Sequence, residues 1–469
     1  MEFVSTRGRA PSLGFGDVLL TGLANDGGLY VPAAWPQLPE PPAAGSSPRS
    51  YADIAIEVMT PFVAGSIDAG AFAGMVEDAY ATFVAPDVTP LLDLGGDVHL
   101  MELFHGPTLA FKDVALQLVG RLFDHELAAR GERVTIVGAT SGDTGSAAIE
   151  ACRDRDAVDI FVLHPHGRVS DVQRRQMTTV TSTNVHNVAI DGTFDDCQDL
   201  VKAMFADERF RNRIRLGAVN SINWARVMAQ IVYYVVASER LVGRRSPVSF
   251  SVPTGNFGNV FAGWGARSMG LPIDRLIVGS NSNDILTRTL ASGRMDMNEV
   301  IPTLSPSMDI QISSNFERLL FELNGRDGQA IADLMTQFRA EGSVTLGDTY
   351  VESLGEVWHG YRVDDDGEGG TRHIIKQVFD TTGIVVDPHT AVGIGAAWQA
   401  GPGAGPTVCL GTAHPAKFPD AVESAIGDRP ALPERVADLF EREEQMDRLP
   451  NNLAAVQAFV EAKARITAG

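Results

Sequence analysis

Cysteine is scarce in this 469-residue sequence, which holds only Cys152, Cys197 and Cys409. None of them belongs to a C-x-x-C pair, which argues against a disulfide framework and against a structural zinc site. Long apolar runs are also lacking. No stretch approaches the roughly 20 residues of a membrane span, and the first ten residues lack the apolar core of a signal peptide. We therefore expect a cytoplasmic protein that does not bind membranes.

Positive charge is in deficit as well. The chain has 38 lysines and arginines against 59 aspartates and glutamates, a formal net charge of −21. Such an acidic chain should repel nucleic acid and anionic lipid, so we expect neither as a partner. An anionic ligand must then be held by a local device, such as backbone N–H groups at the start of a helix.

Lysine is the scarcest charged residue: only five of the 38 basic residues are lysines, namely Lys112, Lys202, Lys376, Lys417 and Lys463. The chain uses arginine almost wherever a positive charge is needed. Forming an imine requires a primary amine that can lose its proton, which arginine cannot supply. The retained lysines are therefore candidates for such chemistry.

The pattern of apolar residues predicts an α/β protein. Residues 1–95 indicate an α-rich N-terminal unit with a helix at 69–83 and an exposed loop at 36–50. Beyond residue 95, strands and helices alternate, which predicts parallel sheets with helices on both faces and ligands at the carboxyl ends of the strands. The predicted strands are 133–139, 158–165, 184–192, 248–255, 275–281 and 406–413, and the main predicted helices are 194–207 and 222–241.

The segment FHGPTLAFKDVALQLVG (104–120) places Lys112 at the start of an apolar helix. A helix N-terminus and an apolar surrounding both disfavour a cation, so they favour the neutral amine. The alternative is a surface lysine at a helix start. From this segment alone the two interpretations are equally good.

The segment PTGNFGN (253–259) follows a predicted strand and precedes a helix. Gly255 and Gly258 remove side chains where backbone N–H groups could converge on an anion. The segment is neither a Walker A loop nor G-x-G-x-x-G, and the missing lysine suits a permanently bound phosphate better than a transferred one. A plain strand-to-helix turn remains the alternative.

Two further strand-end segments carry polar residues. GATSGDTGSAA (138–148) could hold a carboxylate with its N–H groups and hydroxyls, although Asp143 could equally be a helix cap. GTAHPAKFP (411–419) offers a hydroxyl for a ring nitrogen, or is a plain loop. The histidines of HPH (164–166) have no carboxylate or cysteine partner nearby, and we predict no metal site.

Together these segments resemble the threonine synthases, which are pyridoxal phosphate (PLP) enzymes of the tryptophan-synthase-β fold type. STRG (5–8) and DGGLYVP (26–32) resemble the N-terminal signature of that family, and FHGPTLAFKD resembles its cofactor-lysine motif. TSGDTG, PTGNFGN and TAHPAKFP follow in the order of the family. The length and the separate N-terminal unit are similar to the longer, bacterial and fungal branch.

The resemblance implies a role for each matched position. Lys112 matches the lysine that forms the Schiff base with PLP, Thr412 matches the hydroxyl residue facing the pyridine nitrogen, and Asp143 lies at the position beside the ring hydroxyl. The loop for the cofactor phosphate would be Gly255, Asn256, Phe257, Gly258 and Asn259. The substrate carboxylate would lie at Thr140, Ser141 and Thr144. Apart from the resemblance, the polar segments 281–284 and 313–318 offer candidates for the substrate phosphate. These are Asn281, Ser313, Ser314, Asn315 and Arg318, and His105 and Lys417 are others.

The implied reaction converts O-phospho-L-homoserine and water to L-threonine and phosphate. We expect the N-terminal unit at 1–95, a larger PLP-binding domain at 96–130 and 241–469, and a smaller domain at 131–240 that moves to exclude water. The oligomeric state, monomer or dimer, stays open. The alternatives are a dehydratase or phospholyase on the same fold, a non-catalytic homologue, and a nucleotide-binding α/β protein.

Overall fold

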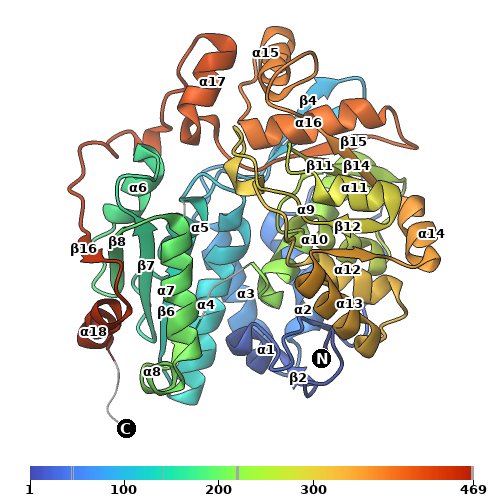
Figure 1. The fold of residues 1–469 in the computed structure, drawn as a ribbon. Coiled ribbons are helices and arrows are strands. Elements are labelled where there is room, and N and C mark those ends of the chain that lie inside the picture. Colours follow the sequence, from blue (N-terminus) through green and yellow to red (C-terminus); the bar gives the residue numbers. More distant parts are fainter. Residues whose placement is uncertain (44, 46, 141, 218–220, 466–469) are drawn as a thin grey trace. The chain divides into compact units, whose positions relative to one another are not determined.

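The computed structural model describes residues 1–43, 45, 47–140, 142–217 and 221–465 (Figure 1). The chain divides into two compact units. The first consists of Met1–Val18, Gly22–Phe111 and Ser221–Ala431, and the second of Leu19–Thr21, Lys112–Asn220 and Leu432–Gly469. Within the described ranges, no helix has both the length and the apolar character needed to cross a bilayer.

A six-stranded sheet forms the centre of the first unit, in the order β14-β11-β10-β15-β5-β4. All neighbouring strands are parallel except β4, which runs antiparallel to β5 at the edge. The central strands are entirely buried, as expected for strands covered on both faces. Their bounds are β4 Leu91–Gly95, β5 Val98–Glu102, β10 Val248–Pro253, β11 Ile273–Ser280, β14 Trp358–Arg362 and β15 Thr407–Gly411.

Three helices pack together beside this sheet: α9 (Trp224–Val242) contacts both α10 (Gly258–Ser268) and α2 (Tyr51–Val63). Close approach of α9 and α10 depends on Gly263, where a Cβ atom would lie 2.8 Å from Cε1 of Tyr234. On the sheet itself, α16 (Pro388–Ala400) packs against β10, β11 and β15. The predicted helix 222–241 is confirmed as α9.

The N-terminal part of the first unit contains a small sheet that the sequence did not indicate. Strand β1 (Glu2–Ser5) pairs antiparallel with β2 (Leu13–Gly14) and with β3 (Tyr30–Pro32). The helix predicted at 69–83 is α3 (Ala69–Tyr80), and the segment 36–50 contains no helix or strand in its described residues. A capping box between Ser50 and Asp53 then starts α2.

The second unit is built on a five-stranded parallel sheet in the order β16-β8-β7-β6-β9 (Figure 1). Apolar side chains of β6, β7 and β8 form one core with α7 (Phe194–Ala206) and α18 (Leu453–Lys463). Elsewhere in the unit, α5 (Asp143–Cys152) packs against β7, and α4 (Lys112–Arg130) packs on α5. The strands are β6 Val134–Ala139, β7 Val158–Pro165, β8 Val185–Asp191, β9 Leu216–Gly217 and β16 Asp447–Pro450, close to the predicted ranges for β6, β7 and β8.

The packing units differ from the predicted domain boundaries in three ways. Helix α4 belongs to the second unit because it packs on α5, and α9 belongs to the first because it packs on α10 and α2. Residues 432–469 return to the second unit because β16 pairs with β8. The other elements are α1 Phe15–Thr21, α6 Asp171–Thr178, α8 Glu208–Arg213, α11 Ile285–Ser292, β12 Arg294–Asp296, α12 Phe316–Leu323, α13 Gly328–Glu341, β13 Ser343–Thr345, α14 Asp348–Val357, α15 Thr371–Thr382 and α17 Pro419–Ile426.

Candidate active site

Lys112 is the first residue of α4, at the start of the second unit. Its side chain is buried, and its Nζ lies 3.4 Å from Oδ2 of Asp143. The preceding residue, Phe111, is the last of the segment Gly22–Phe111 of the first unit, and its backbone N–H donates a 2.8 Å hydrogen bond to the carbonyl of Thr412. Lys112 is therefore an enclosed primary amine paired with a carboxylate, unlike a lysine on an open surface.

Asp143 stands at the beginning of α5, after the turn that leaves β6. The N-cap of α5 is Gly142, whose φ of 151° is a backbone conformation that favours glycine. Thr140 shapes this turn: its Oγ1 accepts hydrogen bonds from the backbone N–H groups of Gly142 (3.0 Å) and Gly145 (2.9 Å). The Asp143 carboxylate does not serve as the side-chain cap of the helix and faces Lys112.

Two other residues are predicted at the substrate carboxylate. Ser141 falls outside the described residues. Thr144 is half-buried in the first turn of α5. The turn therefore combines a helix N-terminus with hydroxyl groups, which is suited to an anion, and Thr140 contributes by holding its shape.

The loop predicted to hold the cofactor phosphate connects β10 to α10 in the first unit. Phe257, the N-cap of α10, has a left-handed φ of 64°, and no side chain caps the helix. The ring of Phe257 stacks on Trp358 with the centroids 5.2 Å apart, which fixes the unusual turn. Gly255 must be small because a Cβ atom there would lie 2.8 Å from the carbonyl oxygen of Ser307.

Asn259 completes this loop and is held by two tyrosines of α9. The hydroxyl of Tyr233 donates to Oδ1 of Asn259, and the hydroxyl of Tyr234 donates to its backbone carbonyl at 2.9 Å. The Nδ2 of Asn259 is buried and has no hydrogen-bond partner among the described residues. An uncapped helix start with a buried, unused N–H donor is what a phosphate group requires.

Three residues predicted at the substrate phosphate support this same loop. Ser313 Oγ donates to the carbonyl of Gly255 at 2.6 Å, and Asn315 Nδ2 donates to the carbonyl of Asn256 at 2.8 Å. Ser314 is partly exposed, and its Oγ lies 3.3 Å from Oδ1 of Asn256. Residues 313–315 therefore hold the backbone carbonyls of residues 255 and 256 in place.

Two further candidates have internal partners. Arg318 is completely buried: its Nε donates to the carbonyl of Tyr30 (3.0 Å), its Nη2 to that of Ile222 (2.6 Å), and its Nη1 to Asn315 Oδ1. Burial lowers the pKa of Arg318 to about 9, which leaves it charged at neutral pH. Its guanidinium group donates hydrogen bonds to partners inside the first unit. These contacts give no support to a direct contact between Arg318 and the substrate.

Asn281 is similarly occupied. Its Nδ2 lies within hydrogen-bonding distance of Thr303 Oγ1 (2.8 Å), Ser305 Oγ (2.9 Å) and Asp309 Oδ1 (2.8 Å), and the side chain is buried. These bonds tie the segment after β12 to the carboxyl end of β11. The structure thus gives Asn281 a role in holding a loop.

The segment after β15 places Thr412 and Lys417 in the interior of the first unit. The N–H of Thr412 donates to Thr390 Oγ1 at 3.1 Å, so its backbone is fixed and neither backbone contact uses its hydroxyl. Lys417 is buried, and its Nζ donates to the carbonyl of Thr108 at 2.7 Å. His105 is partly exposed, with Nε2 2.7 Å from Oε2 of Glu102.

His414, in the same segment, is a partly buried, neutral imidazole. Desolvation lowers its pKa from 6.5 to about 4. Its Nδ1 accepts a 3.1 Å hydrogen bond from the backbone N–H of Ala416, which requires that nitrogen to be unprotonated. Geometry and burial therefore agree on the neutral form.

Sequence reasoning missed three residues that position the predicted ones. Gln173 on α6 donates from Nε2 to Oδ1 of Asp143 at 2.8 Å, and Tyr233 and Tyr234 hold Asn259. The tyrosines were recognised only as part of a helix. Nothing in the local sequence pattern links them to a loop about 25 residues away.

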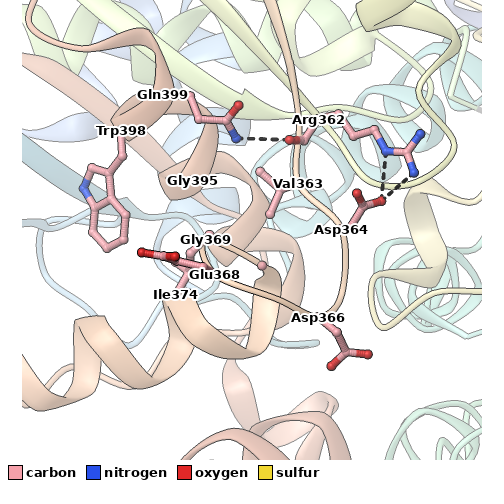
Figure 2. A pocket seen from close by; sticks show the side chains of 11 residues that line it. Arg362, Val363, Asp364, Asp366, Glu368, Gly369, Ile374, Gly395, Trp398 and Gln399 are labelled. Atoms are coloured by element: carbon pink, nitrogen blue, oxygen red, sulfur yellow. Dashed lines mark hydrogen bonds and ion pairs between the residues drawn. The ribbon is translucent and has the colours of Figure 1, made fainter.

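One pocket of about 470 Å³ lies outside all these groups, beside the loop that follows β14 (Figure 2). Its lining includes Asp364, Glu368 and Trp398. Arg362 pairs with Asp364 at 2.7 Å and receives at its backbone carbonyl a hydrogen bond from Gln399 Nε2. No predicted site residue lines this pocket, so it gives no support to an alternative active centre.

Three family models match the chain. The model described as "Threonine synthase N terminus" matches residues 2–80, "Pyridoxal-phosphate dependent enzyme" matches residues 85–335, and "Threonine synthase, C-terminal" matches residues 390–460. Together they account for most of the sequence, and the middle one spans Lys112 and the loop at 255–259.

Curated relatives match over nearly the full length. A threonine synthase of Pseudomonas aeruginosa is 56% identical over 462 residues, which cover 98% of each chain. A threonine synthase of Schizosaccharomyces pombe is 42% identical and covers 91% of this chain and 89% of its own. Among solved structures, a PLP-bound threonine synthase from Brucella melitensis superposes with a TM-score of 0.97 at 51% identity, covering 99% of this chain and 100% of that one.

Proposed function

Because the chain belongs to the threonine synthase family of PLP-dependent enzymes, we propose that it converts O-phospho-L-homoserine and water to L-threonine and phosphate. The full-length match to a PLP-bound relative carries this conclusion. Both the loop at 255–259 and the cofactor-lysine motif lie within the matched region. The long bacterial and fungal branch is the one to which the chain belongs.

Each unit, considered by itself, has residues that fit one part of the cofactor. The uncapped N-terminus of α10 and the unused Nδ2 of Asn259 suit the PLP phosphate, and Lys112 supplies an enclosed primary amine for the Schiff base. When bound, PLP would withdraw electrons from the substrate carbon that loses its proton. The role of Thr412 would be to place its hydroxyl at the pyridine nitrogen, since its N–H and carbonyl are already engaged.

We propose that Lys112 Nζ carries the protons. It would remove the proton from Cα of the substrate, assist the proton removal at Cβ, and return a proton after water adds at Cβ. The Asp143 carboxylate, 3.4 Å away, stabilises Nζ whenever it is positively charged. We propose that the substrate carboxylate binds at Thr140 and Thr144, and the sequence adds Ser141 as a further candidate.

The residues predicted to contact the substrate phosphate differ in their hydrogen-bond partners inside the protein and in their exposure to solvent. Ser313 and Asn315 donate to the cofactor loop, Arg318 donates to Asn315 and to carbonyls outside that loop, and Asn281 holds a neighbouring loop. His105 and Ser314 are both partly exposed to solvent. We therefore propose His105 and Ser314 as the first positions to test for contact with the leaving phosphate.

The test is a product assay on the purified, PLP-loaded protein with O-phospho-L-homoserine. We expect threonine and phosphate in a one-to-one ratio, and none from the Lys112→Ala variant. Formation of 2-oxobutyrate in place of threonine would assign the chain to a dehydratase. Absence of both products in a protein that shows PLP absorbance would refute the proposed reaction while leaving the cofactor assignment intact.

A further inference from the structure

A chain of polar side chains leads from Ser170, exposed at the start of α6, to the nitrogen of Lys112, all within the second unit. Ser170 Oγ donates to Gln173 Oε1 at 2.9 Å, Gln173 Nε2 donates to Asp143 Oδ1 at 2.8 Å, and Asp143 Oδ2 lies 3.4 Å from Lys112 Nζ. Gln173, Asp143 and Lys112 are each less than one-tenth exposed. We propose that Gln173 is a positioning residue whose amide fixes the Asp143 carboxylate and thereby sets how strongly the nitrogen of Lys112 holds a proton.

The chemistry of the partners fixes the orientation of the Gln173 amide. An ionised carboxylate can only accept hydrogen bonds, so the NH₂ group must face Asp143, and the carbonyl oxygen is left to accept from the hydroxyl of Ser170. Both ends of the amide are thus occupied. The amide has a single orientation, and it supplies a neutral donor that adds no competing charge.

The turn at Gly142 is built around the same amide. A Cβ atom at Gly142 would lie 2.3 Å from Oε1 and 2.5 Å from Cδ of Gln173. The backbone of Gly142 also has a φ of 151°, which other residues rarely adopt. Glycine at this position therefore lets the Gln173 side chain lie directly on the turn that presents Asp143.

Fixing one carboxylate oxygen determines what the other can do. With Oδ1 held by Gln173, Oδ2 points at Lys112, and a hydrogen bond to a buried carboxylate favours its charged form. A charged carboxylate at this distance favours the protonated nitrogen on Lys112. Nearby in sequence or on the same helices, Asp113 follows Lys112 and Glu150 lies on α5, and Arg435 interacts electrostatically with both acids.

This inference rests on the proposed function, because its readout is the absorbance of PLP bound to Lys112. The test is to record the visible spectrum of wild type and Gln173→Met between pH 6 and 10.5. Methionine keeps the length of the side chain but removes both hydrogen bonds. We expect the midpoint at which the protonated band is lost to fall by about one pH unit, as when an opposite charge close to a titrating group is weakened.

Two controls separate positioning from general damage to the unit. Gln117→Met makes the same change at another buried glutamine of the second unit, and it should leave the midpoint unchanged. Asp143→Asn should lower the midpoint by itself, and adding Gln173→Met to it should produce no further shift, because Gln173 acts through Asp143. If Gln173→Met does not fold, Ser170→Ala should give a smaller shift in the same direction.

An unshifted midpoint in Gln173→Met, a band that is pH-independent in both proteins, or an additive shift in the double variant would overturn the proposal. These results differ from a failure of the proposed function. A wild-type protein without a visible band that depends on Lys112 would refute the cofactor assignment. A protein with the band but without threonine formation would refute the reaction alone.

Discussion

Replacing Gly120 by alanine should force α4 and α5 apart, and these are the helices that begin with Lys112 and Asp143. A Cβ atom at Gly120 would lie 2.0 Å from the carbonyl oxygen of Ala151 and 2.8 Å from its carbonyl carbon. An ordinary contact of this kind is about 3.4 Å, so the helices must separate by about 1.4 Å. The obstacle is backbone, which cannot rotate away.

We expect Gly120→Ala to lower the free energy of unfolding by about 3 kcal/mol, the upper end of the usual range for overpacked cores. For a unit of this size, that corresponds to a fall in melting temperature of about 6–12 °C. Differential scanning calorimetry of Gly120→Ala measures it. Because the shift also moves Asp143 relative to Lys112, the visible absorbance of the PLP-loaded variant should change.

Gly74 provides the matched control. It lies inside α3, and a Cβ atom there would meet no atom within 4 Å. Gly74→Ala should therefore raise stability by about 0.5–1 kcal/mol, because alanine loses less backbone entropy in a helix. A Gly120→Ala variant as stable as wild type would refute the close packing of α4 on α5.

Two further predictions concern residues of the first unit, Tyr234 and His414. Tyr234→Phe should weaken PLP binding about five- to tenfold, because it removes a hydrogen bond to the carbonyl of Asn259 while keeping the ring, and an unchanged Kd in a fluorescence titration would contradict this role. The pKa of His414 is about 4 in the folded state and 6.5 when the residue is exposed. Between these pH values the imidazole is protonated in the unfolded state but not in the folded state. The free energy of unfolding should therefore fall as the pH drops from about 6.5 to 4. In His414→Gln, this fall in the free energy of unfolding should be smaller by at most about 3 kcal/mol, as measured by urea unfolding at both pH values. An equally steep fall in the variant would show that other groups are responsible.

Local patterns in the sequence predicted the central strands and the loops that follow them. The glycines around residue 255 and the apolar helix after Lys112 are signals carried by neighbouring residues. Gln173 lies 30 positions beyond Asp143, and its amide meets that carboxylate only because α5 and α6 pack together. Its role depends on tertiary structure, which periodicity does not report.

The same limit applies to Arg318 and to the end of the chain. An arginine in a polar segment suggests an anion site, yet Arg318 donates to carbonyls of Tyr30 and Ile222 that are far from it in sequence. Residues 432–469 join the second unit through the pairing of β16 with β8, which begins more than 250 residues earlier. Neither the hydrogen bonds of Arg318 nor the pairing of β16 with β8 can be predicted from neighbouring residues in the sequence.

The central claim is that Lys112 carries the cofactor, and reduction with borohydride tests it most directly. Reduction makes the bond between PLP and lysine permanent, and digestion with mass spectrometry then identifies the modified peptide. With only five lysines in the chain, the assignment is unambiguous. The account predicts one phosphopyridoxyl group, on Lys112. A label on Lys417 or on any other lysine, or no label in a PLP-treated protein, would contradict it.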